Sequence, residues 1–169
     1  DEVRHARQMR RLASRRGLAG PKQLGSFKRA QEAARSVEQL ALENAVEGCV
    51  REAYGALLAT YQAERAHSTE LRNAFREIAT DERSHAALAE DVAEWLNGQL
   101  DAPAAERVEA ARVDALSELW SSLDDYQREP ELGLPGAEVA RALFAHYFGA
   151  WQRPVPALKE PALGDSVPA

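Results

Sequence analysis

The sequence predicts an all-α protein, and two features of its 169 residues carry that prediction. Polar and apolar residues nowhere alternate with the period of two that a half-buried strand requires, and runs of valine, isoleucine and threonine are absent. Glycine and proline instead collect in a few short stretches, and apolar residues recur at helical spacing between them. No apolar run reaches the roughly 20 residues of a membrane span.

The short stretches rich in glycine and proline divide the chain into five segments, and each segment is expected to be a helix. We expect these helices over residues 1–16, 37–66, 69–97, 103–128 and 135–152, with an ordered crossover between the first two. The second segment is introduced by Ser36, which with Gln39 forms a capping-box pattern. The third ends at Gly98, and the fourth begins where Asp101 can cap its first turn.

These segments suggest a three-part organisation. Residues 1–98 are expected to form a helical bundle, with two additional C-terminal helices in residues 101–153 packed on it and a proline-rich tail in residues 154–169. The net charge of −6 is unevenly distributed, because residues 1–37 hold ten basic residues against three acids. The arginines of the first segment recur at helical spacing without interleaved aromatics, which favours a solvated helix face over a nucleic-acid interface.

The third segment carries the clearest functional pattern. Its core-facing stripe consists of Leu71, Phe75, Ile78, Glu82, His85, Ala89, Val92 and Leu96. Two of these eight positions are polar, and a glutamate and a histidine on a buried seam cost several kcal/mol unless hydrogen bonds or a metal compensate. Glu82 and His85 are therefore candidate site residues.

The first segment repeats this arrangement. "DEVRHA" at residues 1–6 matches "DERSHA" at residues 81–86, and Glu2 and His5 begin a stripe that continues with Met9 and Leu12. Residues three apart share a helix face, so each Glu-x-x-His pair can bind a metal from one side. Imidazole with carboxylate suits iron, manganese or zinc. A third copy, Glu64 with His67, lies at a helix end and is expected to be a surface pair.

The second segment offers a single glutamate at the same level. Its expected inner stripe is Leu40, Glu47, Val50, Tyr54, Leu58 and Tyr61. Glu47 lies 35 residues before Glu82, so two long helices joined by a tight turn can bring the two carboxylates level. Cys49, two residues further on, should point away from them as a small buried residue. The three tryptophans are expected in core or interhelix packing.

"AVEGCVREAYGALL" followed by "FREIATDERSHAAL" resembles the helix pair of the ferritin-like superfamily, with rubrerythrin-type di-iron proteins closest in pattern. The resemblance covers about residues 1–97 and implies a ferritin-like up-down bundle that binds two iron ions, or manganese or a mixed pair, and acts on O₂ or peroxide. The metal ligands that it implies are Glu2, His5, Glu47, Glu82 and His85. Tyr54 would lie beside the centre as a hydrogen-bond partner or electron relay.

The resemblance also implies a ligand helix that these residues do not include. The family's centre uses four ligand-bearing helices, and the sequence shows three. The repeat offset of 80 places the partner of Glu47 about 33 residues before Asp1, with a tyrosine about seven residues later. We therefore expect an upstream helix, or else a second copy or a partner chain that completes the bundle. Iron storage and a metal-free interaction module are the alternative functions.

Overall fold

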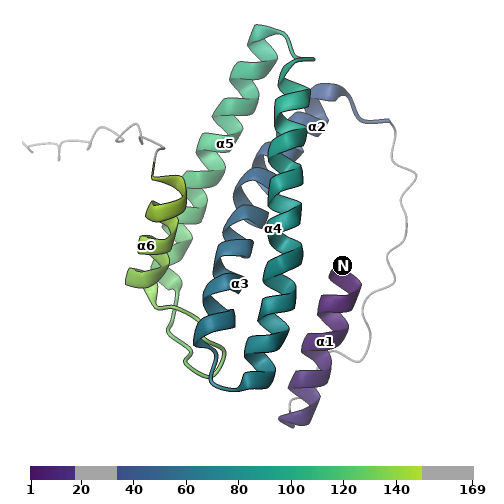
Figure 1. The fold of residues 1–169 in the computed structure, drawn as a ribbon. Helices are drawn as coiled ribbons and strands as arrows, with labels where there is room; N and C mark the ends of the chain where they lie inside the picture. Colours follow the sequence, from purple (N-terminus) through teal and green to yellow (C-terminus); the bar gives the residue numbers. More distant parts are fainter. Residues whose placement is uncertain (18–33, 150–169) are drawn as a thin grey trace, which may run out of the picture.

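The computed structural model describes residues 1–17 and 34–149, and Figure 1 shows how their helices are arranged. The α-helices are α1 (Glu2–Arg15), α2 (Val37–Glu43), α3 (Ala53–Arg65), α4 (Thr69–Asn97), α5 (Ala102–Ser122) and α6 (Ala137–Phe148). A π-helix, η1 (Asn44–Glu52), joins α2 to α3, and a 3₁₀ turn, η2 (Leu123–Asp125), follows α5. The β-structure of the described residues is one isolated bridge between Glu129 and Leu134. The all-α prediction is confirmed.

The predicted helix starts are confirmed at their caps. The Ser36 hydroxyl accepts a hydrogen bond from the Gln39 backbone, and the Gln39 side chain accepts one from the Ser36 backbone, which is the predicted capping box. The Ser68 hydroxyl accepts from the Leu71 N–H at the start of α4. The Asp101 carboxylate accepts from the Ala104 N–H at the start of α5.

One helix geometry and two boundaries differ from those expected. The predicted helix over 37–66 is helical throughout, but η1 replaces its middle with π geometry. The α5 helix ends at Ser122, earlier than the predicted residue 128, because η2 tightens the chain into a turn. The α6 helix begins at Ala137 after Gly136 in an extended conformation, whereas 135 was predicted. The predicted crossover and tail lie largely outside the described residues, as does Trp151.

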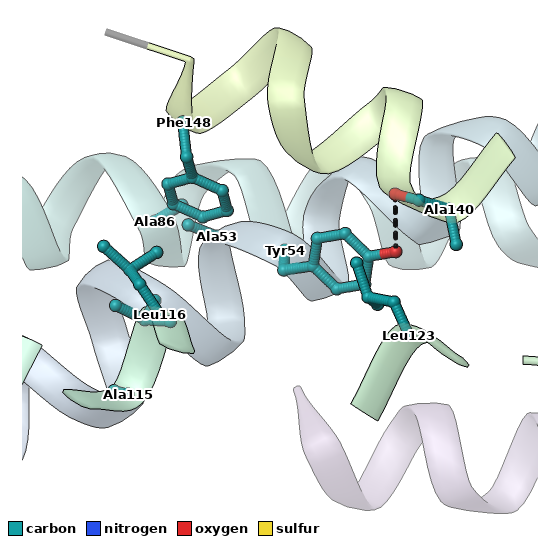
Figure 2. Packing of buried hydrophobic residues seen from close by; sticks show 9 residues of the cluster. Ala53, Tyr54, Ala86, Ala115, Leu116, Leu123, Ala140 and Phe148 are labelled. Atoms are coloured by element: carbon teal, nitrogen blue, oxygen red, sulfur yellow. Dashed lines mark hydrogen bonds between the residues drawn. The ribbon is translucent and has the colours of Figure 1, made fainter. Parts of the chain in front are cut away.

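The long helices pack side by side. Figure 1 shows α3 and α4 as an antiparallel pair, with α5 and α6 on one side and α1 against the lower half of α4 on the other. The larger apolar core joins η1, α3 and α4 to the C-terminal helices, and Figure 2 shows this core around Tyr54, Leu116, Leu123 and Phe148. A smaller core holds α1 to α3 and α4 through Leu12, packed with residues such as Leu71 and Phe75.

Among residues 1–17 and 34–149, none of the helices combines the length and the apolar character needed to cross a bilayer.

Candidate metal centre

The candidate centre lies in the seam between α1 and α4, which run antiparallel. Arg15 pairs with Glu70 at one end of the seam, and the Gln8 amide donates to Glu77 at 2.9 Å. Asp1 and His85 meet at the other end. This antiparallel register brings the two copies of the Asp-Glu-x-x-His motif face to face, because residue 5 of the first copy lies level with residues 81 and 82 of the second.

One carboxylate of the seam faces both imidazoles. Glu82 Oε1 lies 3.4 Å from His5 Nδ1, and Glu82 Oε2 lies 3.7 Å from His85 Nδ1. Glu2 Oε1 approaches the same two nitrogens, at 3.7 Å from His5 and 4.0 Å from His85. Each imidazole Nδ1 therefore has an oxygen of Glu82 and an oxygen of Glu2 nearby, which makes two similar donor sets that share both carboxylates.

The other nitrogen of each imidazole meets an aspartate on the opposite helix. His5 Nε2 lies 2.7 Å from Asp81 Oδ2, and His85 Nε2 lies 3.3 Å from Asp1 Oδ2. The two copies of the motif are thus cross-paired, since the aspartate of each copy contacts the histidine of the other. A carboxylate that accepts a hydrogen bond from Nε2–H fixes the orientation of the ring and leaves Nδ1 free to bind a metal.

Burial of the cluster is graded from the seam outward. The side chains of His5, Glu82, His85 and Glu2 are 8%, 16%, 29% and 75% exposed, respectively. Burial raises the pKa of the Glu82 carboxyl, and the negative charge of Glu2 adds to this effect, although both imidazoles oppose it. The hydrogen bond from His5 lowers the pKa of Asp81, and Arg4 acts in the same direction.

The donor set fits a transition metal. Glu2, His5 and Glu82 each offer one ligand atom, and these three atoms lie within 4.8 Å of one another. Asp1, Glu2, Asp81 and Glu82 place four carboxylates in the seam, and Arg4 pairs with the two aspartates among them. A bound cation would offset this excess of negative charge, and mixed imidazole and carboxylate ligands suit iron, manganese or zinc.

The expected convergence of Glu47 with Glu82 is not observed. The Glu47 side chain is 53% exposed and pairs with Arg51 at 2.6 Å. The physical reason is η1, because residues five apart share a face in a π-helix whereas the expected stripe assumed α-helical spacing. Val50 and Tyr54 of that stripe are buried, but Glu47 faces a groove beside α4.

Glu52, which the sequence analysis did not single out, lies closer to the cluster. It is one π-turn beyond Glu47 and lines a hollow of about 330 Å³ together with Glu2 and His85. Its negative charge also contributes to the raised pKa of Glu82. Glu52 could have been considered from the sequence, since it lies on the same helical segment as Glu47. The α-helical periodicity assumed there places Glu47, and not Glu52, on the inner stripe.

Tyr54 is buried on the side of its helix that faces the C-terminal elements. Its hydroxyl donates to the Ala140 carbonyl at 3.3 Å, as Figure 2 shows, and its ring packs edge-on against Tyr126. Burial raises the pKa of the Tyr54 hydroxyl. Because the Tyr54 hydroxyl donates its hydrogen bond to α6, the contacts of Tyr54 do not support its expected role as a hydrogen-bond partner of the centre.

An open apolar groove adjoins the cluster, between α2 and η1 on one side and the C-terminal half of α4 on the other. Its two hollows, of about 310 and 330 Å³, share Asn44, Glu52 and Val92. Trp95 and Leu88 of α4 are 62% and 60% exposed at its edge. Trp95 was expected in core or interhelix packing, and the core alternative is wrong, because its side chain lies at the open edge of this groove.

The remaining candidate residues behave as predicted from their positions. Glu64 and His67 are both exposed, which confirms the surface assignment of the third Glu-x-x-His pair. Cys49 is 1% exposed, and burial raises the pKa of its thiol. A hollow of about 650 Å³ between α4 and α5 is lined by none of the motif residues. Donor atoms, rather than cavity volume, therefore locate the candidate centre.

The comparisons with known proteins add no assignment to this geometry. No family model, curated protein or solved structure matches the chain.

Proposed function

We propose that the chain binds two metal ions, iron or alternatively manganese, in the α1–α4 seam, and that it is a ferritin-like di-iron oxidoreductase acting on O₂ or peroxide. The observation that carries the proposal is the Glu82 carboxylate, whose two oxygens face the Nδ1 atoms of His5 and His85. A carboxylate held between two imidazoles on opposite helices is the arrangement of a dinuclear carboxylate centre.

Each residue of the cluster has a defined task in this proposal. His5 and His85 would each bind one ion through Nδ1, and Glu82 and Glu2 would be shared between the ions. Glu52, at the edge of the groove, could supply a further carboxylate. A bound iron pair would supply electrons for reduction of the oxidant. The groove beside Glu2 and His85 would give small molecules access to the site.

Metal binding can be tested with a control from the same sequence. Purified chain titrated anaerobically with Fe²⁺, and separately with Mn²⁺, should bind about two ions, and Glu82→Gln should abolish binding of the pair. Glu64→Gln removes the acid of the exposed third Glu-x-x-His pair and should change nothing. Absence of binding by the parent chain, or equal loss in both variants, would contradict the proposal.

A metal-free interaction module is the second candidate function. The exposed Trp95 and Leu88 at the groove and the solvent-facing Glu47 favour it. The same titration distinguishes the two candidates, because an interaction module that has lost its metal retains no ions after dialysis.

A further inference from the structure

We propose that Arg4 is a positioning residue that orients both histidines of the centre at once, an inference that rests on the proposed metal site. The Arg4 side chain contacts neither imidazole. It acts through the two aspartates of the cross-paired motif, Asp1 and Asp81, each of which meets the histidine of the opposite helix.

A single nitrogen of Arg4 joins the two aspartates. Arg4 Nη2 lies 2.8 Å from Asp1 Oδ1 and 2.5 Å from Asp81 Oδ2. The oxygen of Asp81 that it contacts also meets His5 Nε2 at 2.7 Å, and the other oxygen of Asp1 meets His85 Nε2 at 3.3 Å. One guanidinium is therefore one contact away from both imidazole rings.

The chemical consequence concerns which nitrogen of each ring is free. An aspartate that accepts a hydrogen bond from Nε2–H holds the ring in the tautomer whose Nδ1 lone pair points at Glu82 and Glu2. A guanidinium that donates to such a carboxylate fixes its orientation. Without Arg4, Asp1 and Asp81 would repel each other across the seam, and both rings would lose their fixed partner.

The two copies of the motif are not equivalent in this respect. Ser84 stands in the second copy where the first has Arg4, and the neighbouring Arg83 reaches Thr60 and Thr80 at 3.3 Å. Among the described residues, the cation that contacts both aspartates comes from α1. Arg4 is also 54% exposed, so its removal leaves no cavity in the core.

The experiment compares Arg4→Met, Arg4→Lys and the matched control Arg83→Met. In the metal-free chain at pH about 8, above the ordinary imidazole pKa of about 6.5, downfield proton NMR should show protected Nε2–H signals for His5 and His85. Histidine-to-glutamine variants assign these signals. Titration with Mn²⁺ then gives the affinity, and circular dichroism checks that each variant retains its helices.

Arg4→Met should remove both N–H signals and lower the affinity for both ions by about tenfold, the loss typical of an outer-shell partner. Arg4→Lys should retain both signals, because one ammonium can replace the single nitrogen that makes both contacts. Arg83→Met should match the parent chain. Unchanged signals in Arg4→Met, or loss of the His5 signal alone, would overturn the proposal. The NMR result needs no metal, so it is decided separately from the proposed function.

Discussion

Two features of its surroundings disfavour the negative charge of Glu82 in the metal-free protein. Its side chain is 16% exposed, and the negative charge of Glu2 lies on the facing helix. Its folded-state pKa is therefore raised above the ordinary value of about 4.3. Between these two values the folded chain holds a proton that the unfolded chain has released. The free energy of unfolding therefore falls as pH rises through this window.

Glu82→Gln should consequently stabilise the metal-free chain at neutral pH, while it abolishes stabilisation of the chain by metal. Thermal unfolding at pH 7, with and without Mn²⁺, measures both effects. Glu64→Gln, at an exposed position, should leave the melting temperature unchanged in either condition. A lower melting temperature of metal-free Glu82→Gln would mean that the contacts of Glu82 with the two imidazoles outweigh the cost of its burial.

The α1 helix depends on the cluster more than the other helices do. It buries only His5 and Leu12 among its own residues, and its contacts with α4 are largely polar. Four carboxylates crowd the seam at its N-terminal end. Because a bound cation would draw these carboxylates together, metal should strengthen the docking of α1 on α4.

Limited proteolysis measures this docking directly. Trypsin should cleave after Arg7 or Arg11 at least several-fold more slowly when Mn²⁺ is bound, whereas cleavage after Arg107 in α5 should be unaffected. Equal protection of α1 with and without metal would show that the contacts of α1 in the metal-free chain are sufficient to hold the helix.

The π-helix η1 packs very closely on α4, and its glycine is needed for that contact. A Cβ added at Gly48 would lie 2.6 Å from Ala89 Cβ and 2.9 Å from Asn44 Oδ1. Gly48→Ala should therefore destabilise the chain by about 1–3 kcal/mol. Gly55→Ala is the matched control in α3, where a Cβ would meet nothing within 4 Å.

The control should stabilise the chain by about 0.5–1 kcal/mol, because alanine favours the helix more than glycine does. Urea denaturation of both variants gives the comparison. Equal stability of the two variants would mean that η1 can move away from α4 at little cost.

Helices and their caps could be predicted from sequence because their causes are local. Ser36 with Gln39 and Asp101 with Ala104 lie within one turn of each other. The pairing of α1 with α4 was also predictable, since the repeated motif places like residues on matching stripes. The π geometry of η1 was not predictable from sequence. A period of about 3.6 residues per turn was assumed, and the close packing of η1 on α4 depends on residues that are far apart in the chain. That assumption placed Glu47 on the buried stripe, whereas Glu52 lies closer to the cluster.

At the scale of the whole molecule, the open groove exposes two large apolar side chains to solvent. Leu88 and Trp95 are more than half exposed, whereas Leu96, one residue further along α4, is 2% exposed. The double variant Leu88→Ala with Trp95→Ala should bind less of the apolar dye ANS and change the free energy of unfolding by no more than about 0.5 kcal/mol per site. Leu96→Ala should instead cost about 2–5 kcal/mol.

Fluorescence titration with ANS and urea denaturation provide the two measurements. Unchanged dye binding in the double variant would show that the dye binds elsewhere, such as in the hollow between α4 and α5. The exposure of Trp95 was not predictable from its residue type, because a large apolar side chain on a helix can face either a neighbouring helix or an open groove.

The cross-pairing of the two motifs has a consequence for how the centre can be inherited. Asp1 contacts His85 and Asp81 contacts His5, so neither copy of the motif has all its partners without the other copy. A helix transplanted with Glu82 and His85 alone would carry a ligand pair whose histidine has lost its carboxylate. A substitution of Asp81 would remove a partner of His5 on the other helix, so the effects of substitutions in the two copies would depend on each other. The centre would thus be acquired, altered or lost as one unit of two helices.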